Sequence, residues 1–381
     1  MIMVTVNIIE CKRILGITLL HRALPTLCKG RENIMCRGLN IKLDNSVFIV
    51  AEMSANHMQD KDRAKRIIEE AAKAGADAIK IQTYLPDTIT VDCRGEEFMC
   101  TPGSPWEGRN LYELYQTTYT PYEWHQDLFE YADKLGILLF SSPFDLGAID
   151  LLEKCNSPIY KIASFEITDI PLIKKAAKTG KPIIMSTGLA SLADIELAVN
   201  MCRSVGNDQI YLLKCVSEYP TPYEDINLRT LVNLKETFGC EVGLSDHTLS
   251  SSVAIAAVAL GASIIEKHFT LSREDKSADA VFSMEPEEFK QMVQEIRCVE
   301  KALGKVNYTL TERQLESRKR SRSLYIVEDV KKGECLNEKN MKSVRPGYGL
   351  HTKYYEDLLE KRVRQDLKKG TPLAWKYIDE I

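Results

Sequence analysis

The sequence lacks a long uninterrupted apolar run. A membrane-spanning helix needs roughly 20 consecutive apolar residues, and apolar stretches such as Val253 to Leu260 fall well short of that length. An apolar run at residues 14–20 is weak as a signal-peptide core, and no convincing cleavage site follows it. We therefore predict a chain that does not enter a membrane.

The sequence also lacks paired cysteines and a charge excess. Its 11 cysteines are irregularly spaced and odd in number, with no CxxC pair, which argues against a disulfide framework and a cysteine zinc site. The formal net charge is only -4, and Lys and Arg are spread along the chain, so nothing favours a nucleic-acid partner or a polybasic membrane surface. These absences predict a cytoplasmic protein with a small-molecule partner.

What is present, from residue 47 to residue 304, is an alternation of short apolar runs with helical patterns that often end in glycine. Repeated strand–helix units of this kind predict a parallel sheet, and eight of them predict an α/β fold of the (β/α)8 TIM-barrel type. The expected strands are 47–53, 78–83, 137–142, 158–164, 182–187, 210–216, 241–247 and 263–269. The expected helices include 60–74, 121–135, 169–178, 192–205, 227–238, 251–260 and 285–302.

The chain of 381 residues is long enough for one large domain and a smaller one. Residues 1–44 do not fit the strand–helix pattern and are expected to be a disordered arm or a stretch ahead of a true start at Met35. Residues 45–305 form the predicted barrel, and 306–322 a polar, basic linker. Residues 323–381 predict a compact β-rich module whose small core needs to dock on the barrel or on a partner subunit.

One predicted connection, 84–120, is much longer than the others and carries Trp106 and several tyrosines. Because it follows a strand, it is expected at the barrel face where enzymes of this fold keep their active sites. We interpret it as a substrate lid; the alternative is an aromatic insertion that packs on itself.

Polar side chains gather where the predicted strands end, which in a barrel is the catalytic mouth. His247 and His268 end neighbouring strands, so their imidazoles can converge on one divalent cation, Mn²⁺ or Mg²⁺, with carboxylate oxygens and water completing its shell. Lys80 and Lys161, together with nearby serines, predict a pocket for a dianion such as a phosphate. The alternative is that each lysine pairs with a neighbouring carboxylate.

At these positions the sequence resembles the bacterial sialic-acid synthase family. The motifs that carry the resemblance are AEMSANH (51–57), KIQTY (80–84), YKIASFE (160–166), PIIMSTG (182–188), YPTPYED (219–225), GLSDHT (243–248), EKHFT (266–270) and RPGYG (345–349). The resemblance covers about residues 47–381. It implies a transferase that condenses phosphoenolpyruvate with an amino-deoxy sugar to give a nine-carbon keto acid and phosphate, and a C-terminal antifreeze-like, or SAF, domain.

The resemblance also implies roles for individual residues. His247 and His268 match the metal ligands of the family, and Glu52, Glu166 and Asp279 match its acidic catalytic positions. The positions expected to bind phosphoenolpyruvate are Lys80, Lys161, Ser164, Ser186, Ser217, Tyr219 and Ser245. Arg345 lies in the segment that crosses to the other subunit in this family, so a domain-swapped homodimer is expected, with Arg345 reaching the active site of the partner.

Within the family, the segment WEGRNLYELY (106–115) favours the branch that forms pseudaminic acid from 2,4-diacetamido-2,4,6-trideoxy-L-altrose. Val216 is one departure, because that branch commonly has Thr there. An N-acetylneuraminate or legionaminate synthase is the nearest alternative and would differ only in its sugar pocket. A non-catalytic sugar-binding protein is a more distant alternative, against which the intact lysines and histidines argue.

Overall fold

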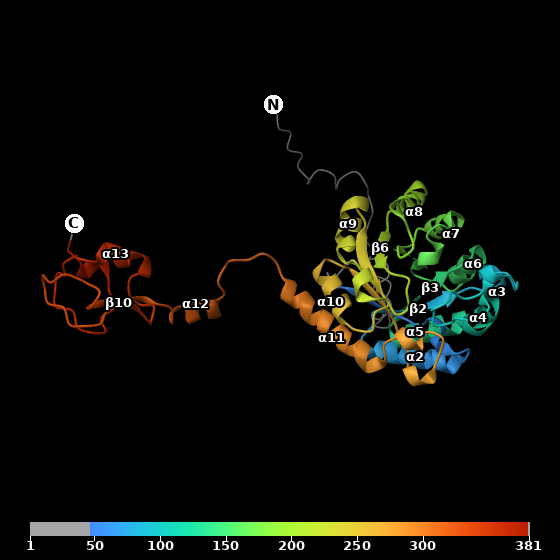
Figure 1. Cartoon of the computed structure of the whole chain (residues 1–381), viewed down its shortest axis with the longest axis horizontal. Helices are drawn as coiled ribbons and strands as arrows, with labels where there is room; N and C mark the ends of the chain where they lie inside the picture. The colour runs from blue at the N-terminus through green and yellow to red at the C-terminus, as the bar shows by residue number, and fades with distance from the viewer. Residues whose placement is uncertain (1–45, 380–381) are drawn as a thin grey trace, which may run out of the picture. The chain divides into compact units, whose positions relative to one another are not determined.

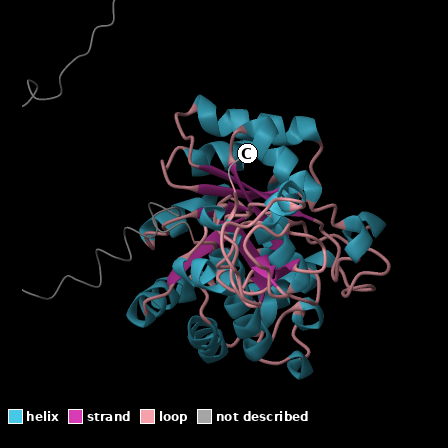
Figure 2. Ribbon diagram, turned by 90° about the vertical axis from the view of Figure 1, so that its left-hand side faces the viewer, coloured by secondary structure: helices cyan, strands magenta, loops and turns pink. Residues whose placement is uncertain are grey.

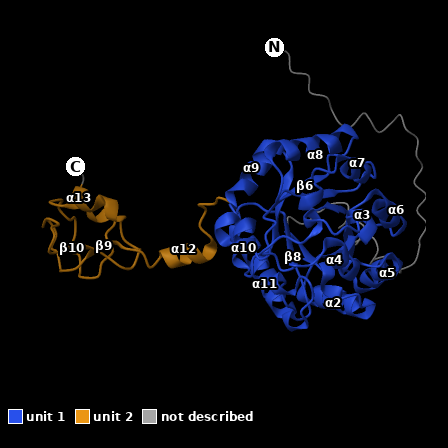
Figure 3. Cartoon of the chain, turned by 45° about the vertical axis from the view of Figure 1, so that its right-hand side comes forward, with its two compact units in different colours: residues 1–304 blue, residues 305–381 orange. Residues whose placement is uncertain are grey.

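The computed structural model describes residues 46–379, so the N-terminal extension predicted at 1–44 lies outside the described residues. The chain divides into two compact units, with the boundary between Gly304 and Lys305 (Figure 3). No helix among residues 46–379 is long and apolar enough to cross a membrane.

The first unit is a closed barrel of eight parallel strands that follow one another in chain order (Figure 1). The barrel closes because β1 pairs with both β2 and β8. Its strands are β1 (Phe48–Glu52), β2 (Ala78–Thr83), β3 (Leu138–Pro143), β4 (Tyr160–Ile162), β5 (Ile183–Ser186), β6 (Ile210–Cys215), β7 (Glu241–Asp246) and β8 (Ile264–His268). The predicted TIM barrel is confirmed.

Helices surround these strands (Figure 2). They are α2 (Lys61–Ala74), α5 (His125–Leu135), α6 (Leu146–Lys154), α7 (Ile170–Ala177), α8 (Leu192–Ser204), α9 (Arg229–Phe238), α10 (Ser252–Ala259) and α11 (Pro286–Leu303). Helix α6 was not assigned from the sequence, because it is short and ends at Cys155 rather than at a glycine.

Local signals explain where such helices begin and end. Helix α2 begins after Asp60, whose carboxylate accepts from the backbone N–H of Asp62 at 2.9 Å and of Arg63 at 3.1 Å. It ends at Gly75, which has a φ of 90° that only glycine adopts without strain. Ile67 and Ile68 are fully buried on the face that packs on the sheet.

Apolar side chains fill the interior of the barrel. This inner cluster consists of Phe48, Val50, Ala78, Leu138, Phe140, Ile159, Ile184, Leu213 and Ile264. A second and larger cluster lies between the strands and the helices. The strands are therefore apolar on both faces, as is typical of parallel sheets covered by helices.

Gly243 in β7 is needed for close packing inside this wall. A Cβ atom at this position would lie 2.4 Å from the carbonyl oxygen of Ile264 and 2.6 Å from Cδ2 of Leu213. We expect Gly243→Ala to lower the free energy of unfolding by about 2 kcal/mol, because overpacking forces the neighbouring strand to shift. Urea denaturation of both proteins checks this, and an unchanged midpoint with an unchanged slope would contradict it.

The second unit has its own small core. It contains α12 (Glu312–Arg318), β9 (Ser323–Ile326), β10 (Met341–Val344) and α13 (Tyr355–Leu358). Strands β9 and β10 form a two-stranded antiparallel sheet, and other segments pair through isolated bridges such as Val330 with Leu367. The core is made of Leu324, Ile326, Val330, Leu336, Met341, Leu358, Val363, Leu367, Leu373 and Ile378.

Helix α12 lies in the stretch predicted to be a polar linker. Its first turn is capped by Thr311, whose hydroxyl accepts from the backbone N–H of Gln314. All of its residues are exposed, so no apolar stripe marked it in the sequence.

Candidate active site

The interior of the barrel changes from apolar to polar along each strand. Val50 in β1 lies in the inner apolar cluster, and Glu52, two residues on, shares its face. The same step leads from Ala78 to Lys80 in β2, and from Ile264 to Glu266 in β8. The polar ends are almost completely buried. The carboxyl ends of the strands thus form a polar mouth above an apolar floor.

Glu266 is the centre of a buried charge network at this mouth. Its Oε1 lies 3.2 Å from the Nζ of Lys80 and 3.5 Å from the Nζ of Lys161. The hydroxyl of Ser245 donates to the same oxygen at 3.1 Å. Lys80 also lies 3.3 Å from Glu52 Oε2. Side chains from five strands, β1, β2, β4, β7 and β8, therefore meet around two carboxylates.

The sequence allowed two roles for the lysines, an anion pocket or pairing with neighbouring carboxylates. The structure brings Lys80 and Lys161 together, as predicted, but each contacts a carboxylate, which was the alternative reading. Glu266 stood at a predicted strand end and received no role. The signal that identifies it is its position two residues before His268, on the same face of β8.

The two carboxyl groups differ in acidity. Burial opposes ionisation of Glu266, but the ammonium groups of Lys161 and Lys80 lower its pKa to about 2. Burial raises the pKa of Glu52 to about 7, against the lowering effect of Lys80. Glu266 is thus the firmly ionised carboxylate of the two. Burial also lowers the pKa of Lys161, against the raising effect of Glu266.

Hydroxyl groups line the same mouth. Lys161 donates to Ser186 Oγ at 2.7 Å, and the backbone N–H of Gly188 donates to Ser164 Oγ at 3.2 Å. A Cβ atom at Gly188 would lie 2.5 Å from Ser217 Oγ, so a larger residue there would displace this hydroxyl. Among the described residues, Ser217 Oγ is a buried oxygen without a hydrogen-bond partner. These donors can bind oxygen atoms of a ligand.

His247 and His268 lie side by side at the ends of β7 and β8, with ring centroids 5.3 Å apart. Nδ1 of His247 lies 2.8 Å from the carbonyl oxygen of Val216, a contact that fixes its ring. Nδ1 of His268 is buried and has no partner among residues 46–379. Burial, together with His247, lowers the pKa of His268 well below its usual value, so this ring stays neutral and keeps a lone pair.

Cys215 is a further buried residue at this point that the sequence analysis missed. Burial opposes ionisation of its thiol, but the neighbouring His247 lowers the pKa of the thiol to about 7. It ends β6 and carries no motif spacing that would have identified it. Within the described part of the chain, no group of three or more His, Cys, Asp or Glu side chains is arranged to hold a metal ion.

The long connection after β2 lies against the mouth. It contains α3 (Pro86–Ile89) and α4 (Leu111–Thr118). Trp106 donates from its indole N–H to the carbonyl oxygen of Ala278 at 3.0 Å. Its ring lies 5.9 Å from the ring of Tyr219 and 6.2 Å from that of Phe282. The ring centroid of Tyr219 in turn lies 4.3 Å from that of His247. This segment therefore packs on the mouth and not only on itself.

The remaining predicted acidic residues lie beside the mouth, Asp279 buried and Glu166 half-buried. Glu166 ends a short 3-10 helix after β4, and burial, reinforced by Asp169, raises its pKa to about 7. Its Oε2 has no hydrogen-bond partner in the described chain. Burial likewise raises the pKa of Asp279, whose Oδ2 accepts from the N–H of Ala55 at 3.5 Å. Arg345 belongs to the second unit, directly after β10.

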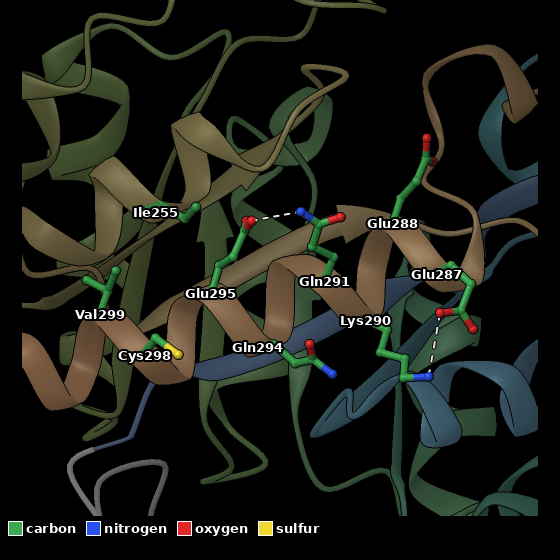
Figure 4. Close-up of a pocket in the computed structure, with 9 residues that line it drawn as sticks. All are labelled: Ile255, Glu287, Glu288, Lys290, Gln291, Gln294, Glu295, Cys298 and Val299. Atoms are coloured by element: carbon green, nitrogen blue, oxygen red, sulfur yellow. Dashed lines mark hydrogen bonds and ion pairs between the residues drawn. The ribbon is translucent and has the colours of Figure 1, made fainter.

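A separate hollow lies on the outer surface of the barrel, along α10 and α11 (Figure 4). Two pairs of its polar side chains contact each other: Gln291 donates to Glu295 at 2.9 Å, and Lys290 lies 3.5 Å from Glu287. None of these residues belongs to a strand end, so this hollow plays no part in the mouth.

A parallel eight-stranded barrel whose mouth combines paired lysines, carboxylates and two histidines defines an enzyme for an anionic substrate. The chain belongs to the NeuB family, whose model matches residues 67–308. The SAF domain model matches residues 321–378. These matches confirm the resemblance to the sialic-acid synthase family and the predicted SAF domain.

The chain is 48% identical to the pseudaminic acid synthase of Helicobacter pylori, with 86% of this chain and 96% of the relative covered. It is 37% identical to the N,N'-diacetyllegionaminic acid synthase of Campylobacter jejuni, with 84% and 97% covered. Among solved structures, it is similar to an N-acetylneuraminic acid synthetase from Leptospira borgpetersenii. That match has a TM-score of 0.63 and 35% identity, and covers 72% of this chain and 90% of the other.

Proposed function

We propose that this chain is a pseudaminic acid synthase. It would condense phosphoenolpyruvate with 2,4-diacetamido-2,4,6-trideoxy-L-altrose and release phosphate. The observation that carries the phosphoenolpyruvate half is the convergence of Lys80 and Lys161 on Glu266 beside two histidines. The sugar half is supported by 48% identity to a pseudaminic acid synthase, against 37% to a legionaminic acid synthase.

The anionic substrate would bind at the mouth, beside the two lysines. The ammonium groups of Lys80 and Lys161 supply charge, and the hydroxyls of Ser186 and Ser164 supply directed donors. Ser217 Oγ gains a partner when a phosphate or carboxylate oxygen arrives, which removes the cost of leaving it unpaired. Ser245 positions Glu266 within this pocket, and Tyr219 closes its side.

His247 and His268 would hold a divalent cation, Mn²⁺ or Mg²⁺. The fit rests on their adjacent rings and on the unpartnered Nδ1 of His268. Two protein ligands leave room for water and substrate oxygens to complete the shell. When bound, the ion acts as a Lewis acid toward a carbonyl oxygen.

Glu166 is suited to moving a proton at neutral pH. Its pKa of about 7 makes both the acid and the carboxylate available. Glu52 has a similar pKa, and a hydrogen bond of 2.9 Å from Gln82 holds its Oε1 in place. These groups and Asp279 would accept the proton of an attacking water or protonate a sugar oxygen.

The aromatic group of Trp106, Tyr219 and Phe282 would face the sugar. Its apolar rings suit the methyl groups of a 6-deoxy sugar with two acetamido groups better than they suit a hydroxyl-rich sugar. An N-acetylneuraminate or legionaminate synthase is the second candidate, because its mouth would bind phosphoenolpyruvate in the same way. The cytoplasm, where both substrates would be made, is the expected compartment.

The test is phosphate release by the full chain with phosphoenolpyruvate and Mn²⁺, with and without EDTA. We expect EDTA-sensitive release with the diacetamido altrose and not with N-acetylmannosamine. Release only with N-acetylmannosamine would move the chain to the sialic acid branch. Sugar binding without any phosphate release would support the non-catalytic reading.

Arg345 would complete the active site of a partner subunit, which makes the enzyme a domain-swapped homodimer. The prediction is complementation: Arg345→Ala and His268→Ala homodimers are each inactive, but after subunit exchange their mixture should recover about a quarter of wild-type activity. Random pairing of equal amounts makes half of the dimers heterodimers. One of the two mouths in each heterodimer is complete, which gives a quarter of the wild-type number of active mouths.

Measuring activity before and after exchange checks this. Activity recovers in a mixed dimer because the His268→Ala chain supplies Arg345 to the mouth of the Arg345→Ala chain, which has an intact His268. A mixture of Arg345→Ala with Lys80→Met Arg345→Ala is the control, since no mouth in it can be complete. A monomeric active enzyme in sedimentation, or no recovery after proven exchange, would contradict the swap.

A further inference from the structure

Behind the two histidines lies a buried ion pair that the proposed reaction does not use. The Nζ of Lys267 in β8 lies 2.7 Å from Oδ2 of Asp246 in β7. The side chains are 0% and 2% exposed, respectively. The two residues are register partners in adjacent parallel strands. The pair thus joins β7 to β8 across the barrel wall.

Its place along the strands is specific. Asp246 directly precedes His247, and Lys267 directly precedes His268. Successive side chains of a strand point to opposite faces, so the ion pair lies on the outer face of the wall where the imidazoles lie on the inner face. Ser245 and Glu266 share the inner face with the histidines and contact each other at 3.1 Å.

The pair also fixes the backbone beyond β7. Lys267 Nζ donates to the carbonyl oxygen of Thr248 at 2.6 Å. Asp246 Oδ1 accepts from the backbone N–H of Thr248 at 2.9 Å. His247 is therefore held between two residues that are bound to the same ammonium group.

A buried ion pair of this kind contributes little net stability to a fold. Removing two charges from water costs several kcal/mol per ion, and apolar replacements of buried pairs are often neutral. What an apolar pair cannot supply is directed bonding to the backbone of Thr248. The energetic argument therefore favours a role in geometry.

We propose that Asp246 and Lys267 form a clamp that sets the separation and orientation of His247 and His268, and are positioning residues for the divalent cation. This inference rests on the proposed metal site. Residues that orient metal ligands typically change metal affinity by 10- to 100-fold when they are mutated. The clamp joins β7 to β8 on the outer face of the barrel wall, opposite the two imidazoles.

The first experiment measures Mn²⁺ binding to the full chain by electron paramagnetic resonance, without substrates. We expect Lys267→Met to weaken Mn²⁺ binding by at least about 10-fold. The matched control is Arg297→Met, which removes a half-buried cation 2.7 Å from Asp77 at the other end of the barrel. It should lower the melting temperature and leave Mn²⁺ affinity unchanged.

The second experiment separates positioning from folding. In the double variant Asp246→Leu Lys267→Met no charge is left unpaired, so its melting temperature should return toward the wild-type value. Its Mn²⁺ affinity should stay low, because the bonds to Thr248 are still missing. Phosphoenolpyruvate binding without metal, measured by calorimetry, should match wild type in both variants.

The outcomes are distinguishable from a failure of the proposed function. If His247→Ala and His268→Ala bind Mn²⁺ as wild type does, the metal site itself is wrong. If those variants lose Mn²⁺ while folded Lys267→Met or the double variant keeps wild-type affinity, the clamp is overturned. Equal loss in Arg297→Met would also overturn it, because general destabilisation would then explain the effect.

Discussion

Lys161→Met is expected to reduce kcat/KM for phosphoenolpyruvate by about 10³-fold. Loss of one preorganised donor in a buried site commonly costs 10²–10³, and this variant removes a positive charge as well as a donor to Ser186. It also leaves Glu266 with Lys80 as its one lysine partner. Steady-state phosphate release at varied phosphoenolpyruvate concentration measures the effect.

A surface lysine provides the control for this variant. Lys181 is partly exposed and pairs with Glu153 on the outside of the barrel, so Lys181→Met should keep nearly wild-type kinetics. Calorimetric titration of Lys161→Met with phosphoenolpyruvate should show weaker binding. If the affinity and kcat/KM of that variant both equal those of wild type, Lys161 has no part in anion binding.

Replacing Glu166 by Gln should change how stability depends on pH. The pKa of Glu166 is raised by burial from 4.5 to about 7 in the folded chain. The folded state therefore holds a proton that the unfolded state has lost between these pH values, and stability falls as pH rises through this window. At about 1.4 kcal/mol per pKa unit, the full penalty is about 3 kcal/mol at pH 8.

Glu166→Gln carries no ionisable proton and should lack this penalty. The measurement is the free energy of unfolding of both proteins from pH 4 to pH 8. Their difference should grow with pH in favour of the variant, and Glu52 does not obscure it because Glu52 is present in both. A difference that is constant over the range would contradict the raised pKa. The same variant should lose about 10²-fold or more in kcat if Glu166 moves a proton.

The barrel was readable from the sequence because its strands are buried on both faces. Each strand is then a short apolar run between helices, and β2 was placed at its observed bounds, Ala78–Thr83. Helices with a cap and a glycine stop, such as α2, were placed within one residue. Helices α6 and α12 have an N-terminal cap but no glycine stop.

The sequence predicts only part of the candidate site. Polar residues two apart at strand ends, such as Glu266 and His268, identify the mouth, because side chains alternate along a strand. Their partners were not readable. The contact of Trp106 with Ala278 joins residues 172 positions apart, and no local pattern encodes it.

By itself, the sequence determined which side chains reach the mouth and which form its apolar floor, because period-two alternation is a property of each strand alone. Only the tertiary structure decided that Lys80 from β2 and Lys161 from β4 both meet Glu266 from β8. That meeting depends on closure of the barrel, which brings the last strand beside the first. The same closure decided that these lysines are paired with carboxylates, because burial requires a partner for every charge.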